Sequence, residues 1–452
     1  MLKIKINNFD KLNLISELAD EFLEPDKYSF TEDEADIEIN AAGTGSLDDI
    51  KRELYIFLRE YTGKSPEWGI LTGVRPVKLA GELIERHKSS AEAAAILKDK
   101  YLLSDKKTSI ITDMYVYQKE LCKEAKPNSA GIYIGIPFCP TRCLYCSFAS
   151  NQASDYDIAR YLEALKKEIA FTGDGMKRSG IIPETLYIGG GTPTSLNAKQ
   201  LDELISQAKA HMDFSGLKEF TVEAGRPDTI SSDKLKVLKD HGVDRISINP
   251  QSMKPETLRL IGRSHTPDDI ITAFDTAGSF GFKSINADLI AGLPQEDLSD
   301  FTSSLEKVKA LGADNITVHS LAVKRASRLI EQDPEFHYKR EEATLLMTDA
   351  AYENLLSSGF KPYYLYRQKH MAGAGENIGY CLDDKACIYN IRIMDEHQSI
   401  IALGAGGISK VYYQGENRLE RVPNVTNFMQ YIERIDEMLN RKEKNIFSKE
   451  VM

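Results

Sequence analysis

Short apolar runs recur at wide intervals from residue 131 onward, and stretches with helical spacing separate them. The runs predict six strands: Gly131–Ile136, Thr185–Ile188, Glu219–Glu223, Arg245–Asn249, Ser284–Ile290 and Asn315–Leu321. The stretches between them predict helices: Asp157–Phe171, Ala198–His211, Ser232–His241, Pro267–Phe280 and Ser299–Leu311. Strands that alternate with helices indicate right-handed crossovers and a parallel sheet. Six such units fit an α/β fold with an incomplete, open (β/α)6 barrel better than a small doubly wound sheet.

Residues 1–125 have a different pattern, which predicts a mixed α+β module whose role the sequence does not reveal. Leu2–Asn7 alternates like a strand, whereas Ser46–Tyr61 and Val77–His87 have apolar residues at helical spacing. Ser46 is expected to cap the first of these helices, because acidic residues follow it.

The last region, residues 331–452, is expected to be mainly helical and to cover the substrate. Glu341–Ser358 has helical spacing, and a glycine turn follows the strand-like Ile400–Leu403. Lys126–Ala130 is typical of a linker. We therefore expect three domains: residues 1–125, a barrel at residues 126–330, and residues 331–452.

The composition is that of an ordinary globular protein. The chain has 452 residues, with 57 Lys and Arg against 68 Asp and Glu and a formal net charge of −11. An acidic chain has no broad electrostatic footprint for nucleic acid, so we expect no such partner. No apolar run approaches the roughly 20 residues of a membrane helix, and the N-terminus lacks the apolar core of a signal peptide. We therefore expect a cytoplasmic protein without a membrane span.

Three of the six cysteines, Cys139, Cys143 and Cys146, lie close together in the sequence. Three thiols at C-x3-C-x2-C spacing can converge on one centre where the chain loops around it. A tetrahedral zinc site needs a fourth protein ligand, and none follows at finger-like spacing. An iron–sulfur cluster can instead hold three irons by thiolates and leave the fourth open. Buried thiols and zinc stay open as alternatives, and the cluster is favoured. The other cysteines are expected to be free thiols in a reducing compartment: Cys122, Cys381 and Cys387.

Further candidate residues follow the predicted strands in order. The cysteines follow the first strand, and the glycine run Gly189–Thr194 follows the second. A glycine run lets a ligand approach closely and offers backbone donors and acceptors, although by itself it is as typical of a tight turn. Glu223, Gln251, Asp288 and Ala322 close or follow the third to sixth strands. Because chemistry gathers at the C-terminal ends of barrel strands, we expect these residues to share one site.

These motifs resemble a known family. The three cysteines, with Tyr145 before the last, resemble the signature of radical S-adenosylmethionine (SAM) enzymes. Tyr133–Cys139, the glycine run and Gly292–Pro294 resemble the oxygen-independent coproporphyrinogen III oxidases. The chain resembles the HemZ-type coproporphyrinogen dehydrogenases more closely still, and these enzymes carry an N-terminal extension. Four motifs show this closer resemblance: Thr72–Pro76, Glu223–Pro227, Thr317–Ala322 and Tyr364–Met371.

The resemblance implies a [4Fe–4S] cluster on the three cysteines. It also implies that SAM binds the open iron of this cluster. Two SAM molecules per chain are expected. It implies that Tyr133, Glu223 and Asp288 take part in catalysis. The residues implied in SAM binding are Tyr133, Tyr145, Gly190, Gly191, Thr192, Glu223, Gln251, Arg263, Asp288, Ala322 and Ile408.

The implied reaction is radical oxidative decarboxylation of two propionates of coproporphyrinogen III to vinyl groups, giving protoporphyrinogen IX in anaerobic haem synthesis. The implied partners are this tetrapyrrole and an electron donor such as a flavodoxin or ferredoxin, and the expected state is a monomer. The substrate carboxylates need nearby cationic side chains, and Arg is favoured because it can bind a carboxylate at two points. The candidates are Arg226, Arg263, Arg325, Arg328, Arg367 and Lys369. Three tyrosines are candidates to stack on the tetrapyrrole: Tyr363, Tyr364 and Tyr366.

One departure from the oxidase pattern keeps other functions open, although the chaperone pattern is not matched either. The oxidases have a fourth cysteine where this chain has Phe148, which is closer to the haem chaperones of the superfamily. Those chaperones have a His-Asn-x-x-Tyr-Trp-type motif, whereas Glu376–Cys381 lacks both the His and the Trp. A radical SAM methyltransferase that opens haem is a third possibility.

Overall fold

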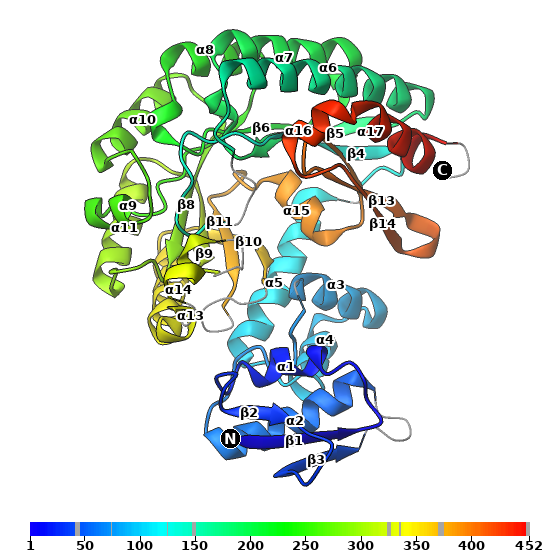
Figure 1. The fold of residues 1–452 in the computed structure, drawn as a ribbon, viewed down its shortest axis with the longest axis vertical. Helices are drawn as coiled ribbons and strands as arrows, with labels where there is room; N and C mark the ends of the chain where they lie inside the picture. The colour runs from blue at the N-terminus through cyan, green and yellow to red at the C-terminus, as the bar shows by residue number, and fades with distance from the viewer. Residues whose placement is uncertain are drawn as a thin grey trace.

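The computed structural model describes residues 1–40, 46–73, 75–123, 125–146, 151–322, 327–333, 336–368 and 375–448. One large sheet with helices around its outer side forms the upper part of the molecule, and a smaller N-terminal module lies below it (Figure 1).

The six predicted barrel strands are confirmed, and they lie side by side in chain order. They are β4 (Ser129–Ile136), β5 (Ile182–Gly190), β6 (Glu219–Glu223), β7 (Arg245–Ser247), β8 (Ser284–Ala291) and β9 (Asn315–Ser320). Each pair of neighbours is parallel. Because all six run the same way, their C-terminal ends meet at one edge, where the predicted site residues follow them.

Helices cover the outer side of these strands as an arc (Figure 1). They are α6 (Asp155–Arg178), α7 (Ala198–His211), α8 (Ser232–Asp240), α9 (Pro255–Leu260), α10 (Pro267–Ser279) and α11 (Leu298–Ala310). Their buried faces pack on strands whose apolar side chains, such as Ile132, Ile188 and Val222, are fully excluded from solvent. Side-chain caps start most of them; Asn197 and Thr266, for example, form capping boxes with the third residue of α7 and α10.

The C-terminal region contributes helices and also extends the sheet at both edges. Its strands are β10 (Lys361–Tyr366), β11 (Asn377–Cys381), β12 (Ser399–Leu403), β13 (Ile408–Tyr413) and β14 (Arg418–Pro423). The full order is β10-β11-β9-β8-β7-β6-β5-β4-β12-β13-β14, with β12 parallel to β4 and β11 antiparallel to β9. The helices are α12 (Arg328–Gln332), α13 (Phe336–Lys339), α14 (Glu341–Ser357), α15 (Ile388–Asp395), α16 (Phe428–Glu433) and α17 (Ile435–Lys442). The sheet thus continues across residue 330, and the division into domains stays a prediction.

The N-terminal module has a small sheet and a core of its own. Strands β1 (Leu2–Asn7), β2 (Tyr28–Phe30) and β3 (Ile37–Asn40) form a parallel sheet in the order β2-β1-β3. The helices are α1 (Asn13–Ala19), α2 (Leu47–Thr62), α3 (Pro76–His87), α4 (Ser90–Asp99) and α5 (Asp105–Cys122). Ser46 caps α2 as predicted, in a capping box with Asp49.

Buried polar contacts join this module to the upper part. Trp68 Nε1 donates to Glu376 Oε2 at 3.0 Å, and Lys107 forms an ion pair with the same carboxylate. Arg367 pairs with Glu21 at 3.0 Å.

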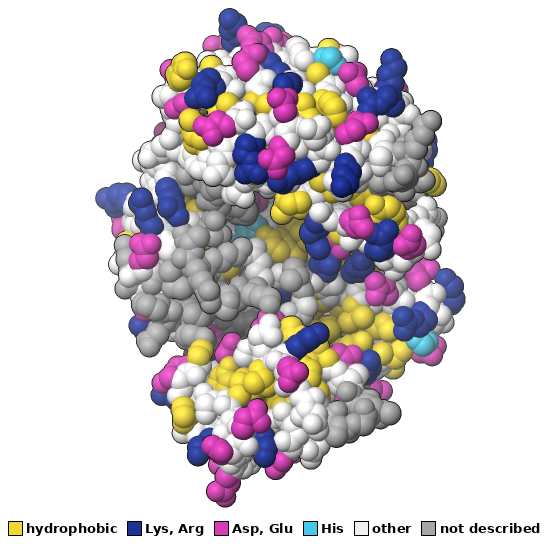
Figure 2. Space-filling view, turned by 45° about the vertical axis from the view of Figure 1, so that its right-hand side comes forward, with side chains coloured by type: hydrophobic (Ala, Val, Ile, Leu, Met, Phe, Trp, Pro, Cys, Tyr) yellow, Lys and Arg dark blue, Asp and Glu magenta, His cyan; other side chains and the backbone are white. Residues whose placement is uncertain are grey.

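Among the described residues, no helix is long and apolar enough to cross a membrane. Acidic and basic side chains are interspersed over the face seen in Figure 2.

Candidate functional site

A cavity of about 520 Å³ opens at the C-terminal ends of the barrel strands. All but one of the residues predicted for the site line it. They are Tyr133, Cys139, Cys143, Tyr145, Cys146, Gly190, Gly191, Thr192, Glu223, Gln251, Arg263, Asp288 and Ala322. The exception is Ile408, which begins β13, is 49% exposed, and follows cavity-lining Gly406 by two residues without lining the cavity itself. Residues at or near the C-terminal ends of the six strands thus line one cavity.

The cysteine loop leaves β4 and is tied to neighbouring segments by its backbone. Cys139 N donates to Asn151 O at 3.0 Å, and Asn151 N donates back to Pro137 O at 3.0 Å. Leu144 N donates to Ile261 O at 2.9 Å. Cys143 is buried and the other two thiols are half-buried. Burial raises the pKa of the Cys139 thiol, partly offset by a hydrogen bond from Thr192. A ligand that needs thiolates must therefore supply positive charge, as an iron cluster does.

The arrangement favours a cluster over a single ion. In the part of the chain that the structure describes, no three His, Cys, Asp or Glu side chains are arranged to hold one metal ion, so the zinc alternative gains no support. A [4Fe–4S] cluster binds each thiolate to a different iron, which suits three cysteines that all line one cavity. The remaining cysteines are free and buried, as predicted: Cys122, Cys381 and Cys387.

The glycine run after β5 packs directly against the cysteine loop. Gly191 N donates to Ile136 O at 2.8 Å, and Thr192 N donates to Phe138 O at 2.7 Å. A Cβ on Gly191 would lie 2.6 Å from Phe138 O and 2.9 Å from Cys139 Sγ, so only glycine permits this approach. The expectation that the run offers free N–H donors is wrong at these two residues, because both N–H groups are already used. Their role is to bring the chain close to the cysteines.

Glu223 ends β6 beneath the cavity and is held at both carboxylate oxygens. Tyr187 Oη donates to Oε1 at 2.7 Å, and Gly190 N donates to Oε2 at 3.1 Å. Burial raises the pKa of Glu223 to about 7, with a smaller contribution from the charge of Asp288. Tyr187 in turn belongs to a stack with Tyr133 and Tyr389, with ring centroids 4.6–6.3 Å apart. The carboxyl group is thus rigidly placed, and a cationic ligand group beside it would favour its ionised form.

Gln251 has an unusual backbone and an unpaired side-chain oxygen. Its φ is +68°, a conformation that costs a non-glycine residue about 1–2 kcal/mol. Gln251 N donates to Asp288 O at 2.9 Å, and Ile290 N donates back to Gln251 O at 3.0 Å, which fixes this geometry. The residue is buried, and its Oε1 has no hydrogen-bond partner. A buried acceptor without a donor at a strained residue lining a cavity fits a ligand that donates a hydrogen bond.

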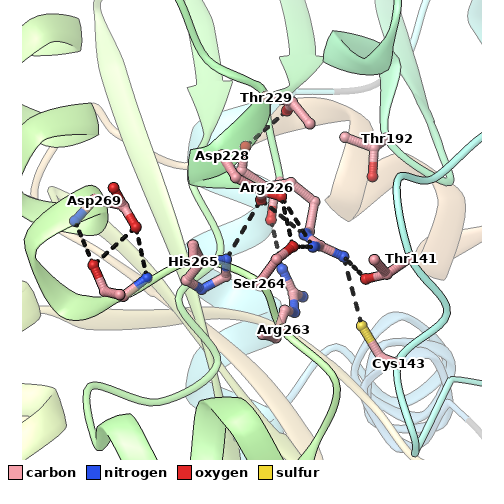
Figure 3. A network of polar contacts seen from close by, with 12 residues as sticks. Thr141, Cys143, Thr192, Arg226, Asp228, Thr229, Arg263, Ser264, His265 and Asp269 are labelled. Atoms are coloured by element: carbon pink, nitrogen blue, oxygen red, sulfur yellow. Dashed lines mark hydrogen bonds and ion pairs between the residues drawn. The ribbon is translucent and has the colours of Figure 1, made fainter.

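Two buried arginines connect the cysteine loop to the loops after β6 and α9 (Figure 3). Arg263 Nη1 donates to Gly225 O at 3.0 Å, and its Nη2 donates to Tyr145 Oη at 3.1 Å. Arg226 contacts Thr141 and Asp228. Because each arginine bridges segments far apart in the sequence, the loop is positioned before any cofactor binds.

The cavity also contains residues for which the sequence analysis assigned no role. His319 Nε2 lies 3.6 Å from Asp288 Oδ2, and its Nδ1 lies 3.2 Å from Asn377 Oδ1. Tyr366 Oη approaches the same Nδ1 at 3.4 Å. His319 lies within β9, whereas the sequence prediction considered residues that close or follow each strand. The alternation of side chains between the two faces of a strand could have identified it.

Most of the residues predicted to contact the substrate do not line the cavity or are already paired within the protein. Arg367 is buried in its ion pair with Glu21 and does not line the cavity, and Arg328 is exposed. Arg226 lines the cavity, but its N–H groups are engaged by protein atoms. Of the tyrosine run, Tyr366 alone lines the cavity, whereas Tyr363 and Tyr364 are buried in a separate core cluster. Three predicted positions lie outside the described residues: Phe148, Arg325 and Lys369.

Comparison with known proteins agrees with this geometry. Residues 133–308 match the family model of the Radical SAM superfamily. The oxygen-independent coproporphyrinogen-III oxidase-like protein HemZ of Bacillus subtilis is 39% identical over 393 residues, which cover 86% of this chain and 78% of that protein. The chain belongs to this radical SAM, HemZ-like family. Members of the superfamily use a [4Fe–4S] cluster and SAM, and the three cysteines, Gly191 and the unpaired Gln251 oxygen fit such ligands.

Other members of the coproporphyrinogen oxidase-like group are also similar to this HemZ-like chain. The heme chaperone HemW of B. subtilis is 35% identical over 234 residues, 51% of this chain and 61% of the chaperone. The crystal structure of the coproporphyrinogen III oxidase HemN from Escherichia coli superposes with a TM-score of 0.56 over 73% of each chain, at 21% identity. The last comparison confirms the predicted radical SAM fold. The two named activities leave the reaction of this chain to be proposed.

Proposed function

We propose that this protein catalyses the oxidative decarboxylation of two propionate side chains of coproporphyrinogen III, giving protoporphyrinogen IX. The observation that carries the proposal is the convergence of Glu223, Gln251, Arg263 and Asp288 on the cavity that contains the three cysteines. When bound, the cluster and SAM supply a carbon radical that can remove a hydrogen atom from a propionate. The residues of the chain then have three tasks: to bind, to orient and to exclude water.

Glu223 and Asp288 are proposed to bind the cationic amino groups of SAM. Glu223 is held by Tyr187 and Gly190, so it can present a carboxylate oxygen in one orientation. Asp288 is oriented by Asn286, whose Nδ2 donates to Oδ1 at 2.8 Å. Two separate carboxylates in one cavity support the use of two SAM molecules per chain.

Arg263 is the proposed cation for an anionic group of SAM or substrate. It is the one arginine of the predicted set that lines the cavity, among the described residues, with a side-chain nitrogen left without a partner. Tyr133 lines the cavity beside the glycine run, and its stack with Tyr187 and Tyr389 makes that wall apolar and rigid. An apolar wall protects a carbon radical from water.

The test is to reconstitute the protein anaerobically with iron and sulfide and add SAM, a strong reductant and coproporphyrinogen III. Mass spectrometry should find two successive losses of CO2, each accompanied by deoxyadenosine. Cys143→Ala is the matched negative control, because it removes a cluster ligand. Deoxyadenosine without decarboxylation, from a protein with full cluster content, would exclude this substrate. A methylated, linear tetrapyrrole formed from haem would indicate the methyltransferase instead.

A second candidate is haem delivery, as named for the HemW relatives. The observation that favours it is His319, an imidazole lining the cavity that could ligate haem iron. This function predicts stoichiometric haem binding without turnover. Titration with haem should then give an absorption change that His319→Ala abolishes, whereas the decarboxylase proposal predicts that coproporphyrinogen consumption accompanies SAM cleavage. An electron donor such as a flavodoxin or ferredoxin is proposed for the decarboxylase alone.

A further inference from the structure

The guanidinium of Arg226 uses all of its five N–H groups within the protein (Figure 3). Nε donates to Asp228 Oδ1 at 3.0 Å, and Nη2 donates to Asp228 Oδ2 at 3.1 Å and to Ser264 Oγ at 2.7 Å. Nη1 donates to Thr141 Oγ1 at 3.0 Å, and its other proton points to Cys143 Sγ at 4.0 Å. The residue is 3% exposed. Arg226 is therefore fully committed and has no donor left for a substrate carboxylate.

The acidic partner fixes the guanidinium in this orientation. Burial favours the neutral acid, but hydrogen bonds from His265, Arg226 and Ser264 hold the pKa of Asp228 well below its usual range. Asp228 takes two N–H groups in the planar, two-point geometry that arginine provides and lysine does not. Once this pair is formed, the plane of the guanidinium is fixed, and Nη1 can only point toward the cysteine loop.

The cysteine loop receives the donor from a firm base. Thr141 Oγ1, which accepts from Arg226, donates to Gly262 O at 3.0 Å. A second donor reaches another cysteine, because Thr192 Oγ1 donates to Cys139 Sγ at 3.4 Å. Cys139 and Cys143 thus each have a side-chain donor from a segment outside the loop. Of the two donors, Arg226 is the charged one.

We propose that Arg226 is a positioning residue for Cys143 that also raises the reduction potential of the [4Fe–4S] cluster. A positively charged N–H donor withdraws electron density from a thiolate sulfur and stabilises the cluster that has gained an electron. The couple concerned is the one-electron reduction from the 2+ to the 1+ state. This inference uses the cluster that the family implies and is independent of the substrate in the proposed function.

The test is a redox titration of the reconstituted cluster with dithionite, monitored by electron paramagnetic resonance, without SAM or substrate. At a fixed solution potential, Arg226→Gln should lower the ratio of reduced to oxidised cluster roughly tenfold, equivalent to a midpoint about 59 mV lower. The matched control is Arg245→Gln. Arg245 is equally buried and faces Glu219 at 3.7 Å, at the opposite ends of the strands. Its midpoint should equal that of the wild type.

The outcomes divide clearly. A full iron content with an unchanged midpoint in Arg226→Gln would overturn the proposal, as would an equal shift in Arg245→Gln. A folded Arg226→Gln protein that fails to load iron, while Arg245→Gln loads normally, supports the positioning of Cys143. If Arg226→Gln does not fold, Arg226→Lys replaces it: the lysine keeps the charge but not the two-point fork to Asp228, so a wild-type midpoint in that variant would refute the role of the fixed Nη1 orientation.

Discussion

Lys107, on α5, and Glu376, just before β11, form an ion pair that is almost fully excluded from solvent. Trp68 donates to the same carboxylate, and the Glu376 backbone oxygen accepts from Ser320 Oγ at 2.8 Å. Ser320 and Asn377, the neighbour of Glu376, line the cavity. The N-terminal module therefore holds a segment of the cavity wall.

Replacing Lys107 by Met should destabilise the protein strongly. It leaves Glu376 buried without its cation, which costs about 3–5 kcal/mol of unfolding free energy. The measurement is urea unfolding at neutral pH. Lys106→Met is the matched control, because its half-exposed pair with Asp349 is worth no more than about 1 kcal/mol. Similar losses in both variants would contradict the assigned importance of the buried pair.

The raised pKa of Glu223 predicts a dependence of stability on pH. A carboxyl with a pKa of about 7 in the folded state holds its proton where the unfolded chain has lost it, so stability falls as pH rises from about 4.5 to 7. Glu223→Gln should remove up to about 3 kcal/mol of this fall. The measurement is the unfolding free energy of SAM-free protein at pH 5 and pH 8. Exposed Glu60→Gln is the control, and an identical pH profile for Glu223→Gln and wild type would refute the prediction.

Two substitutions of Gln251 should separate backbone strain from ligand binding. Both Gln251→Ala and Gln251→Gly remove the unpaired Oε1 and should weaken SAM binding by about tenfold, as expected for one lost hydrogen bond. Glycine accepts the positive φ, so the Gly variant should be more stable than the Ala variant by roughly 1 kcal/mol. Isothermal titration with SAM and thermal unfolding measure the two effects. Unchanged SAM affinity in both would remove Gln251 from the binding site.

Gly191→Ala should reduce cluster loading, because its Cβ would displace the Phe138 backbone and Cys139 Sγ. Iron content and visible absorption after reconstitution measure the effect, with Cys143→Ala as the reference for a lost ligand. Gly278→Ala is the matched control: its Cβ meets nothing within 4 Å, and its place in α10 favours alanine. Normal iron content in Gly191→Ala would show that the loop tolerates the contact.

The barrel and its site could be predicted because each depends on local patterns. Apolar runs identify buried parallel strands, and residues after those runs must meet at one edge. The outer strands were harder, because β10 appears in the sequence as an aromatic and basic run that suggested substrate stacking. The hydrogen bonds that engage the Arg226 guanidinium within the protein could not be predicted either. Its partners Thr141, Asp228 and Ser264 come from three segments, and only the folded chain brings them together.

The first barrel strand, β4, is covered on one side by β12, whose residues 399–403 lie near the end of the chain. During synthesis at about 5–20 residues per second, that edge stays unpaired for tens of seconds after β4 emerges. An open edge with apolar residues such as Ile132 and Ile134 is a template for pairing with other chains. Ribosome-bound chains that stop before residue 399 should therefore need a chaperone that the finished protein does not.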